Sequence, residues 1–246
     1  MLKALIFGTI SGFSLVLGVF LGQKLKLKQK SIAAFMAFGS GVLICALTFG
    51  LMEEAFSKGG FDAVILGFLG GGLVFIIGDY LLHVYGGRKH RRKQIFNSDK
   101  EANGKLITLG AILDGIPESI ALGVTLFNAT GVGLLMLVAI FLSNFPESIS
   151  SISGLLKENF TWKKIYLLWF FVGLAAIAIT VLSFMFLHDI SPNAIGIIEA
   201  FAAGSILAML ADTMMPEAFE EGGFAIGMLT VFGFLTAFIV LRLASA

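Results

Sequence analysis

Long apolar runs, separated by short polar connections, dominate the pattern of this chain. Each run is close to the roughly 20 residues that an α-helix needs to cross the hydrocarbon core of a bilayer. We therefore predict an all-α integral membrane protein with eight transmembrane helices, forming one transmembrane domain over residues 1–246. The predicted helices cover residues 4–22, 32–52, 63–85, 106–127, 131–155, 165–187, 194–215 and 223–243.

Composition agrees with a bilayer as the main solvent. Of 246 residues, 57% are hydrophobic and only 13% are charged, and the mean hydropathy of +0.95 exceeds that of ordinary soluble domains. The single cysteine, Cys45, lies inside an apolar run, so neither a disulfide framework nor a thiolate metal site is expected. We expect the first run to be a retained helix and not a cleaved signal peptide. Lys3 is the only basic residue before it, and no small-residue cleavage site follows it.

Basic residues collect in alternate connections, at 24–30, 86–105 and 157–164. Because Lys and Arg concentrate in cytoplasmic loops, this pattern predicts a protein of the cytoplasmic membrane with both termini outside. We interpret 86–105 as a topogenic cytoplasmic loop that touches anionic lipid, with a regulatory or metal-collecting role as the alternative. The net charge of +1 gives no indication of a nucleic-acid partner.

An internal repeat appears when residues 163 positions apart are compared. The runs Glu54-Ala55-Phe56 and Gly59-Gly60-Phe61 recur as Glu217-Ala218-Phe219 and Gly222-Gly223-Phe224. The repeat pairs the second predicted helix with the seventh, which cross in opposite directions, so it is inverted. Such repeats are typical of secondary transporters, whose substrate sites lie near the midplane. The predicted 3+2+3 arrangement places three helices in 1–85, two central helices in 106–155 and three in 165–243.

The two central helices share a Pro-Glu motif. Ile116-Pro117-Glu118-Ser119-Ile120 is echoed by Phe145-Pro146-Glu147-Ser148-Ile149. A carboxylate at this depth costs roughly 2.5–3.5 kcal/mol on insertion scales, so it normally faces the bundle interior and marks a pathway or a partner. Proline as a simple kink, and Ser or Asn bonding across helices, are the structural alternatives; two echoing motifs on adjacent helices argue against them.

The spacing of polar residues around these motifs predicts a cation site. Asp114 and Glu118 share one helix face, as do Ser143 and Glu147. No Lys or Arg lies at that depth in the two helices, so the carboxylates must take up protons or share a cation. Asn144 adds a neutral oxygen.

Further oxygen donors are expected near the acids. Pro117 and Pro146 should free the carbonyls of Leu113 and Leu142, and Gly115 should let a neighbouring helix or the ion approach. Asp212, inside the seventh predicted helix, joins the site or lines the route to it. The acids at helix ends should be solvated: Glu53, Glu54, Glu217, Glu220 and Glu221.

The motifs Asp114-Gly-Ile-Pro-Glu-Ser and Ser143-Asn-Phe-Pro-Glu-Ser resemble those of the ZIP family of divalent-metal transporters, of bacterial type. The resemblance implies eight helices, both termini outside, and a metal site on the fourth and fifth helices. By position, Asp114 replaces the family's usual histidine, Glu118 and Glu147 match its bridging carboxylates, and Asn144 matches the polar residue after the first ligand of the fifth helix. Gly115 stands where the family has an asparagine, and Ser143 stands where it often has His or Gln. The 165–187 run lacks the acidic residue that the family has in its sixth helix.

The resulting prediction is a divalent-metal transporter mediating uptake, without catalytic residues or a prosthetic group. The metal is the substrate, and its predicted ligands are Asp114, Glu118, Ser143, Asn144, Glu147 and Asp212. Resemblance ranks zinc first, with manganese or iron(II) close behind because oxygen ligands suit harder ions. Expected partners are the metal, the lipid bilayer and, as one option, a second copy in a homodimer. A proton-coupled carrier of another solute and a non-transporting metal-binding relative remain alternatives, while no His-Glu-x-x-His motif supports an intramembrane protease.

Overall fold

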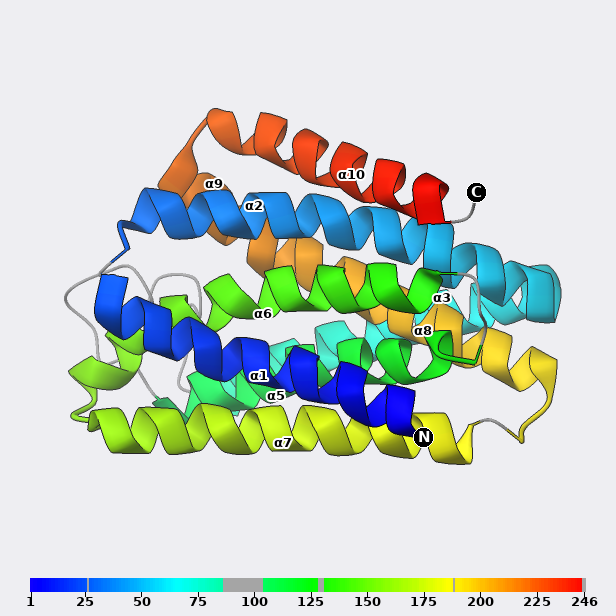
Figure 1. Ribbon diagram of the computed structural model, residues 1–246, viewed down its shortest axis with the longest axis horizontal. Coiled ribbons are helices and arrows are strands. Elements are labelled where there is room, and N and C mark those ends of the chain that lie inside the picture. The colour runs from blue at the N-terminus through cyan, green and yellow to red at the C-terminus, as the bar shows by residue number, and fades with distance from the viewer. Residues whose placement is uncertain (26, 86–103, 128–130, 188, 245–246) are drawn as a thin grey trace.

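The computed structural model describes residues 1–25, 27–85, 104–127, 131–187 and 189–244, and these are helical without any strand (Figure 1). The side chains at 83, 85, 104–108 and 244 also lie outside the description. In chain order the helices are α1 (Leu2–Leu25), α2 (Gln29–Ala46), the π-helix η1 (Leu47–Met52), α3 (Glu53–Tyr85), α5 (Gly104–Thr125), α6 (Val132–Lys157), α7 (Trp162–Phe186), α8 (Pro192–Met209), the π-helix η2 (Leu210–Met214), α9 (Met215–Gly222) and α10 (Ala225–Ala244).

Six helical segments among the described residues are long and apolar enough to cross a membrane. Helices satisfy their own backbone hydrogen bonds, which is the condition for spanning a bilayer. The prediction of an all-helical membrane protein is thus confirmed with six candidate spans, whereas the count of eight is not. The basic segment 86–103 lies outside the described residues. The six spans are Leu2–Leu25, Gln29–Leu82, Val132–Lys157, Trp162–Phe186, Pro192–Gly222 and Ala225–Leu243.

Two helices run further than the hydropathy pattern predicted. The helix expected to end at 52 continues through η1 into α3, and the helix expected to end at 215 continues through η2 to Gly222. The turns come at Gly60 (φ 65°, ψ −164°) and Gly223 (φ 65°, ψ −146°), a backbone region open almost only to glycine. Acidic residues lower the hydropathy of these segments without ending the helix, which explains the misplaced boundaries.

The helices pack as two groups that meet at α5 and α6. α3 lies along α8 and α2 along α10, while α1 packs against α6 and α7, and α5 packs against α7. Contacts of α2 with α6 and of α5 with α8 join the groups. Figure 1 shows the start of α1 and the end of α10 at the same end of the bundle.

The largest apolar core lies where the two groups meet. Its fully buried members include Leu43 of α2, Leu122 of α5, Met136 of α6 and Ile206 of α8. The middle of α5 and α6 is therefore packed against helices on several sides, and Glu118, Ser143 and Asn144 are buried there.

Candidate metal site

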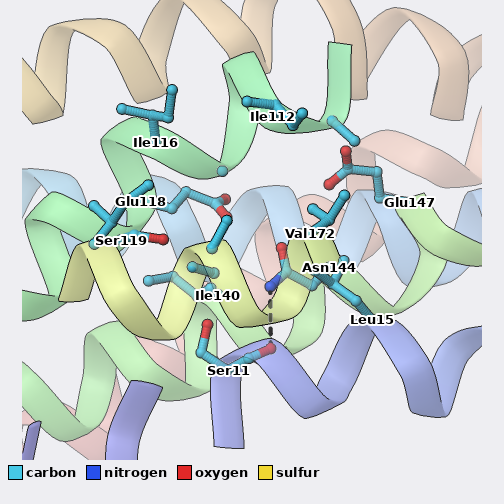
Figure 2. A pocket seen from close by; sticks show the side chains of 15 residues that line it. Ser11, Leu15, Ile112, Ile116, Glu118, Ser119, Ile140, Asn144, Glu147 and Val172 are labelled. Carbon is cyan, nitrogen blue, oxygen red and sulfur yellow. Dashed lines mark hydrogen bonds between the residues drawn. The ribbon is translucent and has the colours of Figure 1, made fainter. Parts of the chain in front are cut away.

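A small cavity lies between α1, α5, α6 and α7, beside the two Pro-Glu motifs (Figure 2). Its volume is about 30 Å³. Because a water needs about 10–15 Å³ by this measure, the cavity has room for one ion with a water beside it. Its walls are formed by Ser11, Leu15, Ala111, Ile112, Gly115, Ile116, Glu118, Ser119, Ile140, Asn144, Glu147, Val172, Ala175, Ala176 and Ile179.

Three of the predicted ligands face this cavity. Glu118 comes from α5, and Asn144 and Glu147 come from α6, so two helices supply two carboxylates and one amide. Figure 2 shows their polar ends directed toward the space between the helices. Glu118 is buried, with 2% of its surface exposed, and Glu147 is partly buried.

Hydrogen bonds hold two of these side chains in place. The Ser143 hydroxyl lies 3.0 Å from Glu118 Oε1, to which it donates, and also 3.0 Å from the carbonyl of Ile140. Asn144 donates from Nδ2 to the main-chain carbonyl of Ser11 at 3.3 Å. The amide oxygen of Asn144 is consequently turned toward the cavity (Figure 2).

The other predicted ligands lie outside the cavity wall. Asp114 is buried one turn before Glu118, close enough for the two carboxyl groups to interact, and Ser143 is buried against Glu118. Asp212 lies in η2 and is exposed. The structure therefore gathers five of the six predicted residues around one point of α5 and α6, and leaves Asp212 apart from the cavity.

The part of the cavity wall formed by α7 offers no side-chain oxygen donor. α7 contributes Val172, Ala175, Ala176 and Ile179, all apolar. Within the described ranges, no three His, Cys, Asp or Glu side chains lie together in a way that could hold a metal. A bound cation would therefore be held by two carboxylates together with amide, hydroxyl or water oxygens, which is the chemistry of a hard or borderline ion.

Two serines at the cavity were not predicted from the sequence. Ser11 of α1 and Ser119 of α5 both line the wall. A serine in an apolar run is a weak signal, because its hydroxyl usually bonds to its own helix. Ser119 follows Glu118 directly in the motif, whereas no motif marked Ser11.

A partly buried ion-pair cluster was also missed. Lys58 of α3 bonds to Glu199 of α8 and lies 2.9 Å from Glu54. Glu199 is fully buried. An acid inside the 194–215 apolar run was the available signal, since such residues seldom occur in membrane helices without a partner.

The structure bears on two expectations about single residues, Glu217 and Gly115. Glu217 was expected to be solvated, but α9 continues the helix past the predicted end and leaves this side chain only 4% exposed. Gly115 was expected to let either a neighbouring helix or the ion approach; an added Cβ there would meet no atom within 4 Å, so no neighbouring helix lies close to it. Gly115 instead opens onto the cavity.

Comparison with known proteins gives the family. Residues 98–244 match the family model described as ZIP zinc transporter, a stretch that is more than half of the 246-residue chain and contains both Pro-Glu motifs. No curated protein matches the chain. The family match confirms the family that the motifs predicted, and it does not test the bacterial type. The chain therefore belongs to the ZIP zinc transporter family and is a multi-pass membrane transporter of divalent metal ions, not an enzyme.

Proposed function

We propose that this protein takes up a divalent metal ion through the cavity between α5 and α6. The observation that carries the proposal is the meeting of Glu118, Glu147 and Asn144 at one cavity without a Lys or Arg in its described wall. Carboxylates in a low-dielectric interior need a compensating cation or protons. A divalent ion neutralises both carboxylates at once.

The proposed ligands form an inner and an outer set. Glu118, Glu147 and Asn144 bind the ion directly. Asp114 and Ser143 lie beside Glu118 and either hold it in place or reach the ion after a small movement. Asp212 is retained as a residue of the route rather than of the cavity, because it is exposed in η2.

Two arguments bear on the identity of the metal, and they favour different ions. Family membership favours zinc, whereas a site built from carboxylate, amide and hydroxyl oxygens without imidazole or thiolate suits manganese or iron(II). We rank zinc first and the two harder ions close behind.

The proposed architecture is eight crossings in an inverted 3+2+3 repeat, with both termini outside. Support comes from features 163 residues apart: η1 and η2 begin at Leu47 and Leu210, and the two turns are at Gly60 and Gly223. α2 and α8 also run in opposite directions in Figure 1, as an inverted repeat requires. The metal would enter from outside, lose most of its water to the ligands, and leave toward the cytoplasm as the repeats move relative to α5 and α6, with protonation of the acids as a release step.

Uptake of metal into proteoliposomes tests this proposal. The purified protein should give saturable uptake of one or more of zinc, manganese, iron(II) and magnesium. Glu118→Gln and Glu147→Gln should each reduce uptake by roughly 10-fold or more, because each removes a charge that binds the ion. Glu220→Gln, at an exposed position of α9, is the control and should transport normally.

Other outcomes would favour the alternatives. Flux that depends on protons and not on metal would indicate a carrier of another solute. Metal binding at Glu118 and Glu147 without any flux would indicate a metal-binding relative that does not transport.

A further inference from the structure

We infer that α1 completes the metal site through Ser11, whose hydroxyl is an oxygen ligand of the ion and whose main-chain carbonyl orients Asn144. The inference rests on the proposed function and adds a third helix to the ligand set. α1 lies outside residues 98–244, so the family match does not extend to it.

The Ser11 hydroxyl differs from those of three other buried serines. Ser14, Ser40 and Ser151 each donate to a carbonyl of their own helix, at 2.5, 2.8 and 2.7 Å. Ser11 makes no such side-chain bond within the described part of the chain, and it lines the cavity. Its hydroxyl oxygen is therefore available to a cation, a ligand that hard divalent ions accept.

The main chain of Ser11 acts on the same site through Asn144. Its carbonyl accepts a bond from Asn144 Nδ2 at 3.3 Å. An amide has one donating and one accepting end, so this bond directs the oxygen of Asn144 toward Glu118 and Glu147 (Figure 2). One residue of α1 thus supplies one ligand and positions another.

The position of α1 is set by close backbone contacts around Ser11. A Cβ on Gly12 would lie 2.5 Å from the carbonyl of Gly173 in α7, and one on Gly18 would lie 2.7 Å from the carbonyl of Phe145 in α6. Helices that approach this closely leave little freedom to shift. Ser11 is thereby held at the cavity, next to the turn of α6 that carries Asn144 and Glu147.

A cysteine in place of Ser11 gives a direct test. Ser11→Cys puts a thiol where the hydroxyl faces the ion, and a thiolate bound to cadmium gives a characteristic ultraviolet charge-transfer absorption. We expect this absorption when Cd²⁺ is added to the purified Ser11→Cys protein, and its loss when excess Zn²⁺ is added. The unsubstituted protein is a built-in blank, because its single cysteine, Cys45, is buried away from the cavity.

A second variant tests the hydroxyl without a new ligand. Ser11→Ala should raise the KM for manganese uptake about 10-fold with a smaller change in the maximal rate, since an ion ligand is lost while the carbonyl remains. Ser40→Ala is the matched control, being a buried helical serine outside the cavity, and should leave KM unchanged.

The outcomes separate this inference from the proposed function. If the unsubstituted protein binds and transports metal, while Ser11→Cys shows no charge-transfer band and Ser11→Ala keeps its KM, then Ser11 is not a ligand. If the unsubstituted protein neither binds nor transports metal, the proposed function itself is refuted, and this inference with it.

Discussion

Glu118 is the most confined carboxylate of the cavity. It is 2% exposed, accepts the Ser143 hydroxyl at 3.0 Å and has Asp114 one turn away on the same helix. A single hydroxyl compensates little of the free energy of burying an ionised carboxylate. A divalent cation at the cavity would compensate it directly, which is why we assign Glu118 the central role in binding.

Gly115 provides a gain-of-function test at the residue scale. It lines the cavity, and an added Cβ would meet nothing within 4 Å. Gly115→Asn should therefore fold normally and add an amide oxygen beside Glu118. We expect metal affinity, measured by titration of the purified protein, to rise by roughly 10-fold, since one ligand is gained.

The control for this gain is Gly227→Asn. Gly227 also has open space around its Cβ position, but it is exposed on α10, away from the cavity. Equal affinities for both variants and the unsubstituted protein would show that position 115 does not face the bound ion.

At the scale of helices, two glycines decide where the chain reverses. Gly60 and Gly223 both have φ of 65° with an extended ψ, and no atom lies within 4 Å of a Cβ added to either. Space is therefore not the restriction at these turns. The restriction is the backbone conformation, which a residue with a Cβ rarely adopts.

Alanine at either turn should destabilise the protein. We expect Gly60→Ala and Gly223→Ala each to lower the free energy of unfolding by about 1–3 kcal/mol through backbone strain. Thermal unfolding of the purified variants in detergent measures this effect as a lower midpoint.

Gly227→Ala is the matched comparison for the turns. Its position in the helix α10 has an ordinary backbone, so alanine there should stabilise by about 0.5–1 kcal/mol. Midpoints that fall equally in all three variants would contradict the strain argument.

At the scale of the whole molecule, a partly buried ionic cluster joins α3 to α8. Lys58 bonds to Glu199, which is fully buried, and to Glu54 at 2.9 Å. Breaking such a pair from one side leaves a charge without compensation, whereas replacing both partners by apolar residues is often neutral. The cluster therefore makes the association of these two helices depend on both partners being present.

A double substitution distinguishes this dependence from ordinary packing. Lys58→Met should lower the free energy of unfolding by about 3 kcal/mol, because Glu199 stays buried without its cation. Lys58→Met with Glu199→Met should recover most of that loss. Unfolding midpoints in detergent compare the two, and a double variant no more stable than Lys58→Met would contradict the account.

Features that depend on neighbours along the chain could be read from the sequence. Apolar runs of membrane-spanning length predicted the helices, since a backbone in lipid must satisfy its own hydrogen bonds. The two Pro-Glu motifs predicted the family, which the match to residues 98–244 confirmed. They also predicted that Glu118 of one helix acts together with Asn144 and Glu147 of the next, because matching motifs on adjacent helices each place a carboxylate in the membrane interior.

Contacts between helices that no repeated motif marks were decided by the tertiary structure alone. Spacing does not say which neighbour a helix face will meet. Ser11 therefore reached the cavity without a sequence signal, and Asp212 remained outside it although it lies in an apolar run. Lys58 and Glu199 are 141 residues apart and meet only because α3 lies along α8. Local periodicity sets the face of each helix, while the close packing of glycines and small residues between helices sets which faces come together.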